Sequence, residues 1–156
     1  SWHFLKLGES VERIYRAALI LRARLPALLA SEPRTDLPLY YSQWRSLLRS
    51  LSSLENYRKA HGPRLEPALV ATFLFFDAQS PRSLRAGTAT IKECLERIAG
   101  GPDLTAAARH IGKLYADLCY ADARTIRRAE SPAFLDGVVD ALTRAHEALT
   151  AQYFVA

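Results

Sequence analysis

The stretch WHFLKLGESVERIYRAALILRARL, residues 2–25, indicates the fold class of this protein. Its apolar side chains recur at alternating steps of three and four residues, which is the spacing of an α-helix with one buried face. We expect a helix from Trp2 or His3 to Leu25, with Pro26 ending or kinking it. The buried face is predicted to hold Phe4, Leu7, Val11, Ile14, Ala18, Leu21 and Leu25.

A second row of side chains runs beside this face and is apolar or small at every position except Glu12. Its members are Leu5, Gly8, Glu12, Tyr15 and Leu19. The helix is therefore predicted to bury two flanks, one of which holds a carboxylate. A buried carboxylate needs a guanidinium partner or a shifted pKa. Two interpretations of Glu12 stay open: a buried ion pair that fixes the helix register, or a polar site at the surface or in a cleft of a bundle.

The rest of the chain has the same helical spacing, interrupted by segments rich in Pro, Gly and polar residues. No segment offers a partner strand, so the sequence predicts an all-α bundle of about six helices in a single domain, residues 1–156. After the first helix we expect helices at about 41–60, 67–76, 82–99 and 103–128, and a last one from the Ser-Pro pair at 131 toward Tyr153 and Phe154.

Composition supports a globular domain, with 49% apolar and 24% charged residues among 156. No apolar run is long enough for a membrane helix, and no signal peptide opens the sequence. Because the sequence has no Met, we expect an excised or trimmed piece. Cys94 and Cys119 are predicted to be free thiols in a reducing compartment, which indicates the cytoplasm.

Patterns that would place a metal or cofactor are absent from the sequence. The four histidines are isolated, without the spacing of a zinc or di-iron site. The glycine-rich phosphate loops and the GxSxG nucleophile motif do not occur. The net charge of +5 is compatible with nucleic acid, but the arginines are spread over every predicted helix and do not form a block. The sequence thus predicts no metal and no cofactor, and it leaves nucleic-acid binding as a less favoured alternative.

The connector FFDAQSPRSLR, residues 75–85, carries more charge than a simple turn requires. Ser80 is the predicted helix cap and Pro81 the first helical residue. Arg82 and Arg85 then lie on one side of the first turn, where a cation opposes the helix dipole. They are predicted either to hold Asp77 or Glu12 through forked hydrogen bonds, or to bind a phosphate or carboxylate ligand.

Three segments together resemble one bacterial family, the alpha-E domain proteins. The opening resembles the start of the second half of that domain, with Phe-Leu-x-Leu-Gly at 4–8 followed by Glu12 and Arg13. WRSLLRSLSSLENYRKAHG, residues 44–62, looks like the next helix of the family. VATFLFFDAQSPRSLR is similar to its V-x-x-F-L-x-x-D…PRS element, and LTAQYF to its C-terminus. The chain departs from the family at Glu9, where Arg is common, at Ile14, where Ala is common, and at Ser80, where Phe is common.

The resemblance implies an all-α fold and the C-terminal half of a domain built from two related helical halves, with the N-terminal half missing. It also implies protein partners, a circularly permuted ATP-grasp ligase and a transglutaminase-like peptidase that modify a small peptide. The favoured hypothesis is an accessory module that docks onto such a partner or presents its substrate. The alternatives are an enzyme in which Glu12 is acid or base beside Arg82 or Arg85, and a basic nucleic-acid-binding bundle. Arg13 is a candidate through its place beside Glu12.

Overall fold

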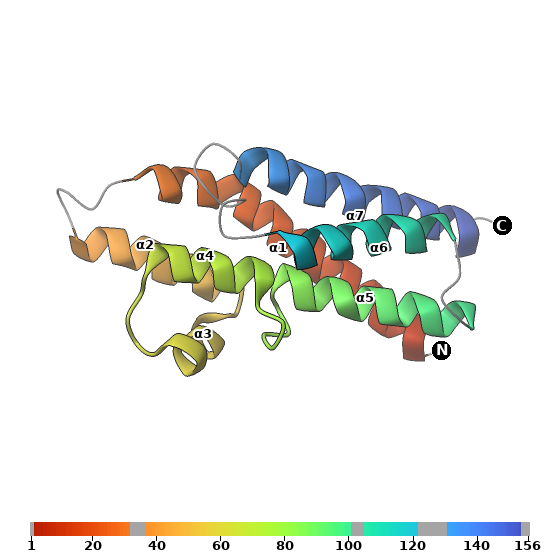
Figure 1. The fold of residues 1–156 in the computed structure, drawn as a ribbon, viewed down its shortest axis with the longest axis horizontal. Coiled ribbons are helices and arrows are strands. Elements are labelled where there is room, and N and C mark those ends of the chain that lie inside the picture. The colour runs from red at the N-terminus through yellow and green to blue at the C-terminus, as the bar shows by residue number, and fades with distance from the viewer. Residues whose placement is uncertain (1, 32–36, 101–104, 122–130, 154–156) are drawn as a thin grey trace.

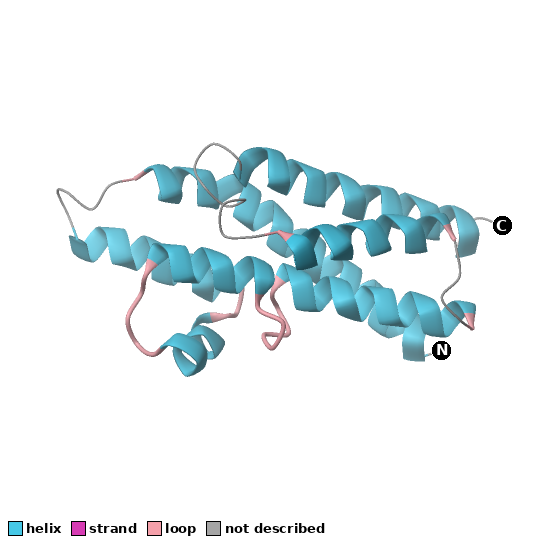
Figure 2. Ribbon diagram, viewed as in Figure 1, coloured by secondary structure: helices cyan, strands magenta, loops and turns pink. Residues whose placement is uncertain are grey.

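The computed structural model describes residues 2–31, 37–100, 105–121 and 131–153, which form helices joined by short loops (Figures 1 and 2). Within these ranges there are seven helices and no strand, so the all-α prediction is confirmed with one more helix than expected. The helices are α1 (Trp2–Ala30), α2 (Leu37–Ser50), α3 (Leu54–His61), α4 (Pro67–Phe76), α5 (Leu84–Ala99), α6 (Ala106–Tyr120) and α7 (Ser131–Tyr153).

Four of these helices, α1, α5, α6 and α7, form a bundle in which each packs against two neighbours. Helix α1 packs most extensively on α5 and also on α7, while α6 joins α5 to α7 on the other side. The chain reverses direction from α5 to α6 and again to α7, the up-and-down arrangement of helical bundles (Figure 1). Helices α2, α3 and α4 pack at one end of the bundle, and α4 lies almost end to end with α5 (Figure 1).

The predicted inner face of α1 is the centre of the core. Six of its seven side chains are buried, from Leu7 to Leu25, and Phe4 is half-buried. Beside this face Gly87 of α5 lets the two helices approach closely, because a Cβ atom at that position would lie only 1.9 Å from Cδ1 of Ile14. The 3–4 spacing therefore identified the side of α1 that the bundle buries.

The helix expected at 41–60 is two helices, because the backbone turns at Ser52. This residue has a φ of 51°, in the left-handed region. Its N–H donates to the carbonyl of Arg49 at 3.0 Å, and the N–H of Ser53 donates to that of Leu48 at 2.8 Å. These two bonds are the Schellman ending of a helix, for which glycine is the usual residue. With serine in the left-handed position, the break between these helices leaves no signal in the sequence.

Other helix ends differ from the prediction by several residues. Helix α1 continues through Pro26 to Ala30. Helix α6 begins after the Thr105 cap and ends at Tyr120, so it is shorter than the predicted 103–128, whose two end residues lie outside the described residues. Phe154 also lies outside them. No helix in the described ranges is long and apolar enough to cross a membrane.

Candidate functional site

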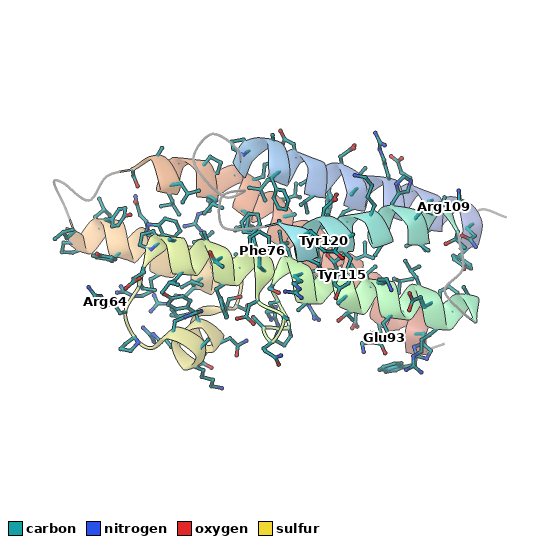
Figure 3. The ribbon with its side chains drawn as sticks, viewed as in Figure 1. Arg64, Phe76, Glu93, Arg109, Tyr115 and Tyr120 are labelled. Carbon is teal, nitrogen blue, oxygen red and sulfur yellow. The ribbon has the colours of Figure 1, made fainter. Side chains whose placement is uncertain are left out.

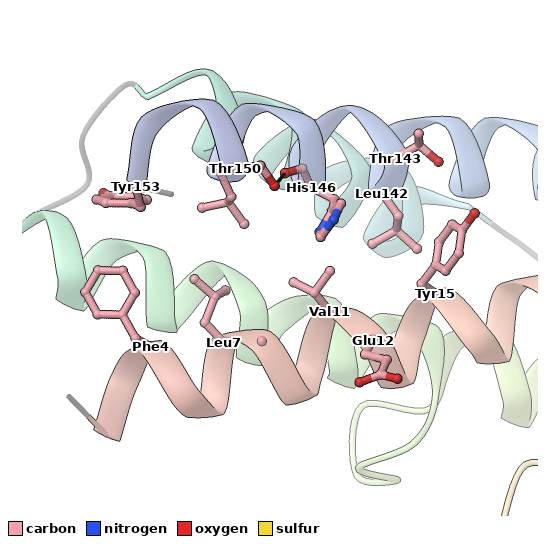
Figure 4. A pocket seen from close by; sticks show the side chains of 12 residues that line it. Phe4, Leu7, Val11, Glu12, Tyr15, Leu142, Thr143, His146, Thr150 and Tyr153 are labelled. Carbon is pink, nitrogen blue, oxygen red and sulfur yellow. Dashed lines mark hydrogen bonds between the residues drawn. The ribbon is translucent and has the colours of Figure 1, made fainter. Parts of the chain in front are cut away.

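A groove of about 500 Å³ lies between α1 and α7, which we call the α1–α7 groove (Figure 4). Phe4, Leu7 and Val11 point from α1 toward α7, and Leu142 points back from α7 (Figure 4). Leu7, Val11, Leu142 and Leu149 are part of the buried core. The groove therefore has an apolar floor that is continuous with the core of the bundle.

The two ends of the α1–α7 groove carry aromatic side chains. At one end the rings of Phe4 and Tyr153 meet edge to face, with centroids 5.2 Å apart. At the other end Tyr15 stands beside Leu142 (Figure 4). His146 and Thr150 of α7 add polar atoms, and the Thr150 hydroxyl already donates to the carbonyl of His146 at 2.9 Å. The groove is thus an apolar channel with a few polar groups, as ligand and partner sites commonly are.

Gly8 lies in the middle of this groove, within α1. A Cβ atom added there would meet no atom within 4 Å outside its own stretch of helix. A helical glycine costs about 1 kcal/mol relative to alanine, and no close packing in the described structure requires this one. Its effect is to leave the backbone of α1 accessible from the groove.

A second depression of about 470 Å³, which we call the arginine depression, is lined by charged side chains. It lies next to the α1–α7 groove along α1, since Glu12 lines both. Arg13 and Arg16 come from α1, and Arg82 comes from the segment before α5. Glu9 and Glu12 also line it. The structure therefore brings together three of the residues singled out in the sequence, Glu12, Arg13 and Arg82.

Glu12 occupies the ridge between the two cavities, because it lines both. Its carboxylate turns away from α7 (Figure 4) and pairs with the guanidinium of Arg16 at 2.7 Å on the same helix. The Glu12 side chain is 63% exposed, so the expected burial of this carboxylate is wrong. Leu5 is also exposed, whereas Tyr15 is half-buried. The second flank of α1 faces the groove and solvent because no helix covers it in the described structure.

Asp77 organises the connector between α4 and α5 through the backbone. Its Oδ1 accepts hydrogen bonds from the N–H groups of Gln79 at 2.8 Å and Ser80 at 2.9 Å. Its carbonyl accepts a short hydrogen bond from the hydroxyl of Ser83. The carboxylate thus forms an Asx turn, a common device for reversing a chain. The predicted ion-pair partner of Arg82 or Arg85 is instead a loop-shaping residue.

The two arginines of the connector have different positions. Helix α5 is capped by Ser83, whose hydroxyl accepts from the N–H of Ala86 at 3.0 Å, and not by the predicted Ser80. Arg82 therefore precedes the cap and is exposed, while Arg85 lies inside the first turn and is half-buried. Arg85 is not among the residues that line the arginine depression. The first turn of α5 thus holds Arg85 but not Arg82, because the helix starts later than predicted.

Side chains that bind metals do not gather in the described part of the chain, where no group of three or more His, Cys, Asp or Glu lies within reach of one ion. Cys94 and Cys119 are free thiols. Cys94 is buried in α5, and this burial raises the pKa of its thiol, although the charge of nearby Lys6 acts in the opposite direction. The negative charge of Glu93, on the outer surface of α5 (Figure 3), also raises the pKa of Cys94, but by less than burial does.

Sequence reasoning did not find the α7 side of the groove. His146, Thr150 and Tyr153 carry no motif that marks a site, and the sequence predicted only that a last helix would reach Tyr153. The available signal was Gly8, a helix-disfavouring residue in an otherwise strong helical stretch. It marks the α1 wall of the groove, but it does not identify the helix that forms the opposite wall.

Comparison with family models gives one match that covers nearly the whole chain. Residues 1–154 match Alpha-E, described as a predicted alpha-helical domain with a conserved ER motif. No curated protein and no solved structure matches the chain.

The dipeptide Glu-Arg occurs twice, at Glu12-Arg13 in α1 and at Glu96-Arg97 in α5. In the second pair each charge is engaged by a residue one turn earlier on the same helix, Glu96 by Lys92 and Arg97 by Glu93. In the first pair Glu12 lines both cavities and Arg13 lines the arginine depression. The pair in α1 is therefore the one that lies where a ligand or partner has access.

Proposed function

The chain belongs to the Alpha-E family, and from this premise we propose that it is a helical accessory module of a peptide-ligating or peptide-modifying system. The proposed partners are an ATP-grasp ligase and a transglutaminase-like peptidase. The module docks onto one of them through the α1–α7 groove. The observation that carries this proposal is an apolar groove left open along α1 by Gly8.

The proposed occupant of the groove is an amphipathic helix of the partner. From Phe4 to Tyr15 the groove follows about three turns of α1, roughly 16 Å, which suits apolar residues spaced at i, i+4 and i+7. Gly8 at the middle lets a second backbone approach closely, as small residues do at helix crossings. A helix laid there would cover apolar side chains of α1 and α7 that are continuous with the core.

A second helix suits this groove better than a compact ligand because of the polar groups along its edge. The Thr143 and Thr150 hydroxyls donate to carbonyls of their own helix, Val139 at 2.8 Å and His146 at 2.9 Å. They therefore do not converge on one point, as the polar groups of a small-molecule site do. Side chains of a helix require only shape and apolar contact along such a surface.

A matched pair of variants tests the docking. Gly8→Leu places a side chain in the groove, whereas Gly112→Leu places one on α6, where a Cβ atom also meets nothing within 4 Å. Neither glycine has a positive φ, so both substitutions are compatible with the helix. We expect the wild-type protein and Gly112→Leu to co-purify with the proposed ligase or peptidase partner, and Gly8→Leu to lose this association.

The activity of the reconstituted system provides the second measurement. We expect ATP-dependent peptide ligation to fall when the protein is omitted, and to fall equally with Gly8→Leu. Glu12→Gln should support full ligation, since the proposed role requires no acid or base. If omission of the protein leaves ligation unchanged, the accessory role is wrong. If Glu12→Gln abolishes ligation while binding persists, the protein is catalytic.

A further inference from the structure

Two arginines of the arginine depression have no partner among the described residues. Neither Arg13 nor Arg82 forms an ion pair or a side-chain hydrogen bond with any described residue, whereas Arg16 pairs with Glu12 at 2.7 Å. Glu9 lies one turn before Arg13, the spacing of a helical ion pair, yet these two do not pair. Two unpaired guanidinium groups from separate segments thus line one cavity.

The position of Arg82 is unfavourable for the local structure alone. It directly precedes the Ser83 cap of α5, where the helix dipole disfavours a positive charge by about 0.3–1 kcal/mol. Its neighbour Asp77 does not compensate for it, because that carboxylate binds the backbone of the connector. Within the described part of the chain, the fold therefore holds a cation at this point without an interaction that explains it.

We infer that Arg13 and Arg82 bind a carboxylate group, the free C-terminus of a peptide whose last side chain is apolar. Each guanidinium can donate two parallel hydrogen bonds to a carboxylate. Arg16 and Glu12 neutralise each other. The other charged groups of the depression are Arg13, Arg82 and Glu9. Their single net positive charge matches the negative charge of one carboxylate. A phosphate dianion would remain partly unneutralised and would be repelled by Glu9.

The walls of the arginine depression identify the rest of the ligand. Ala17, Ile20 and Leu51 form its apolar part, and the cavity of about 470 Å³ has room for the last residues of a chain. An apolar terminal side chain can pack there while its carboxylate reaches the two arginines. This inference goes beyond the docking proposed for the α1–α7 groove, since it concerns the separate depression on the other side of Glu12 and needs no partner protein.

Binding of short peptides to the intact protein tests the inference. The probe is a fluorescein-labelled hexapeptide ending in leucine, made with a free C-terminus and as the C-terminal amide, and followed by fluorescence anisotropy. We expect the free acid to bind at least about tenfold more tightly than the amide, since a hydrogen bond to a charged group is worth about that factor. A third peptide, amidated but with an aspartate side chain near its end, separates a terminal carboxylate from an acidic side chain and should bind as weakly as the amide.

Four substitutions locate the site. Arg13→Gln and Arg82→Gln should each weaken binding of the free acid about tenfold. Two control variants, Arg85→Gln and Arg97→Gln, should leave binding of the free acid unchanged. Arg85 lies three residues from Arg82 but outside the cavity, and Arg97 belongs to the other Glu-Arg pair. All four side chains are at least partly exposed, and circular dichroism will show whether the fold is retained.

Three results would overturn the inference. The first is equal binding of acid and amide. The second is an equal loss in Arg97→Gln and Arg13→Gln, which would show non-specific attraction by a basic protein. The third is competition by inorganic phosphate at lower concentration than by acetate, which would assign the site to a different anion. Because Gly8→Leu should bind the hexapeptide normally, failure of this inference is distinguishable from failure of the docking proposal.

Discussion

Helix α1 meets α5 and α7 in opposite ways, and a glycine lies at each contact. On the α5 side a Cβ atom at Gly87 would lie 1.9 Å from Cδ1 and 2.3 Å from Cγ1 of Ile14. On the α7 side a Cβ atom at Gly8 would meet nothing within 4 Å. Both glycines lie inside helices, where each costs about 1 kcal/mol relative to alanine.

The two glycines therefore have different physical explanations. At Gly87 the cost is offset within the molecule, because the missing side chain makes room for the fully buried Ile14. At Gly8 the described structure contains no contact that offsets it. The α1–α5 contact is therefore complete as it stands, whereas the α1–α7 contact has room for another molecule. Substitutions at the two contacts test this distinction.

The largest expected effect is at the α1–α5 contact. Ile14→Ala should lower the free energy of unfolding by about 2–5 kcal/mol through loss of burial and the cavity left behind. Gly87→Ala should lower it by about 0–2 kcal/mol, since overpacking costs about 1–3 kcal/mol and the gain in helix propensity recovers about 1. The double variant should lose less than the sum, because the new methyl group occupies space that Ile14 vacated.

Denaturant unfolding of the wild type, both single variants and the double variant measures this coupling. Contacting residues show coupling energies of about 0.5–3 kcal/mol, whereas independent sites add within about 0.5 kcal/mol. Additive losses would mean that Ile14 and Gly87 do not touch and that the close approach of α1 to α5 is wrong.

A smaller effect of opposite sign is expected at the groove. Gly8→Ala should raise the free energy of unfolding by about 0.5–1 kcal/mol, because alanine favours the helix and meets no atom there. Gly112→Ala, on α6 with similarly open space, is the matched control and should show a similar gain. Thermal unfolding of both variants checks this. A loss of stability in Gly8→Ala alone would show that the groove is closed by neighbouring side chains.

These contacts show how far sequence reasoning reached. The 3–4 spacing identified the buried face of α1, including Ile14 and Leu21, because a face needs only the helical period. It did not identify the helix that packs on that face, and so the contact between Ile14 and Gly87 was not foreseen. The same limit explains the error at Glu12: the apolar row beside it was interpreted as a buried flank, whereas it borders an open groove.

Local backbone chemistry accounts for the other differences. Serine holds the left-handed position at Ser52, where a glycine would have marked the helix end. Ser80 was the predicted cap of α5, but Ser83, three residues later, is the cap. That choice shifted Arg82 out of the helix and away from Arg85. The candidate site was thus predicted as a set of residues, while its geometry depended on which serine capped the helix.

The smallest expected effect is a pH dependence that arises at Cys94 of α5. Burial raises the pKa of this thiol, so the folded state keeps it protonated at a pH where the unfolded state ionises it. Its contribution to stability is therefore complete below the unfolded pKa of about 8.5 and is lost as the pH rises through the higher folded value. Under reducing conditions, Cys119→Ala should keep the fall in unfolding free energy above pH 8.5, and Cys94→Ala should show less of it. Equal pH profiles for these two variants would mean that Cys94 is as accessible to water as an unfolded thiol, and that α5 is packed more loosely than the contact at Gly87 requires.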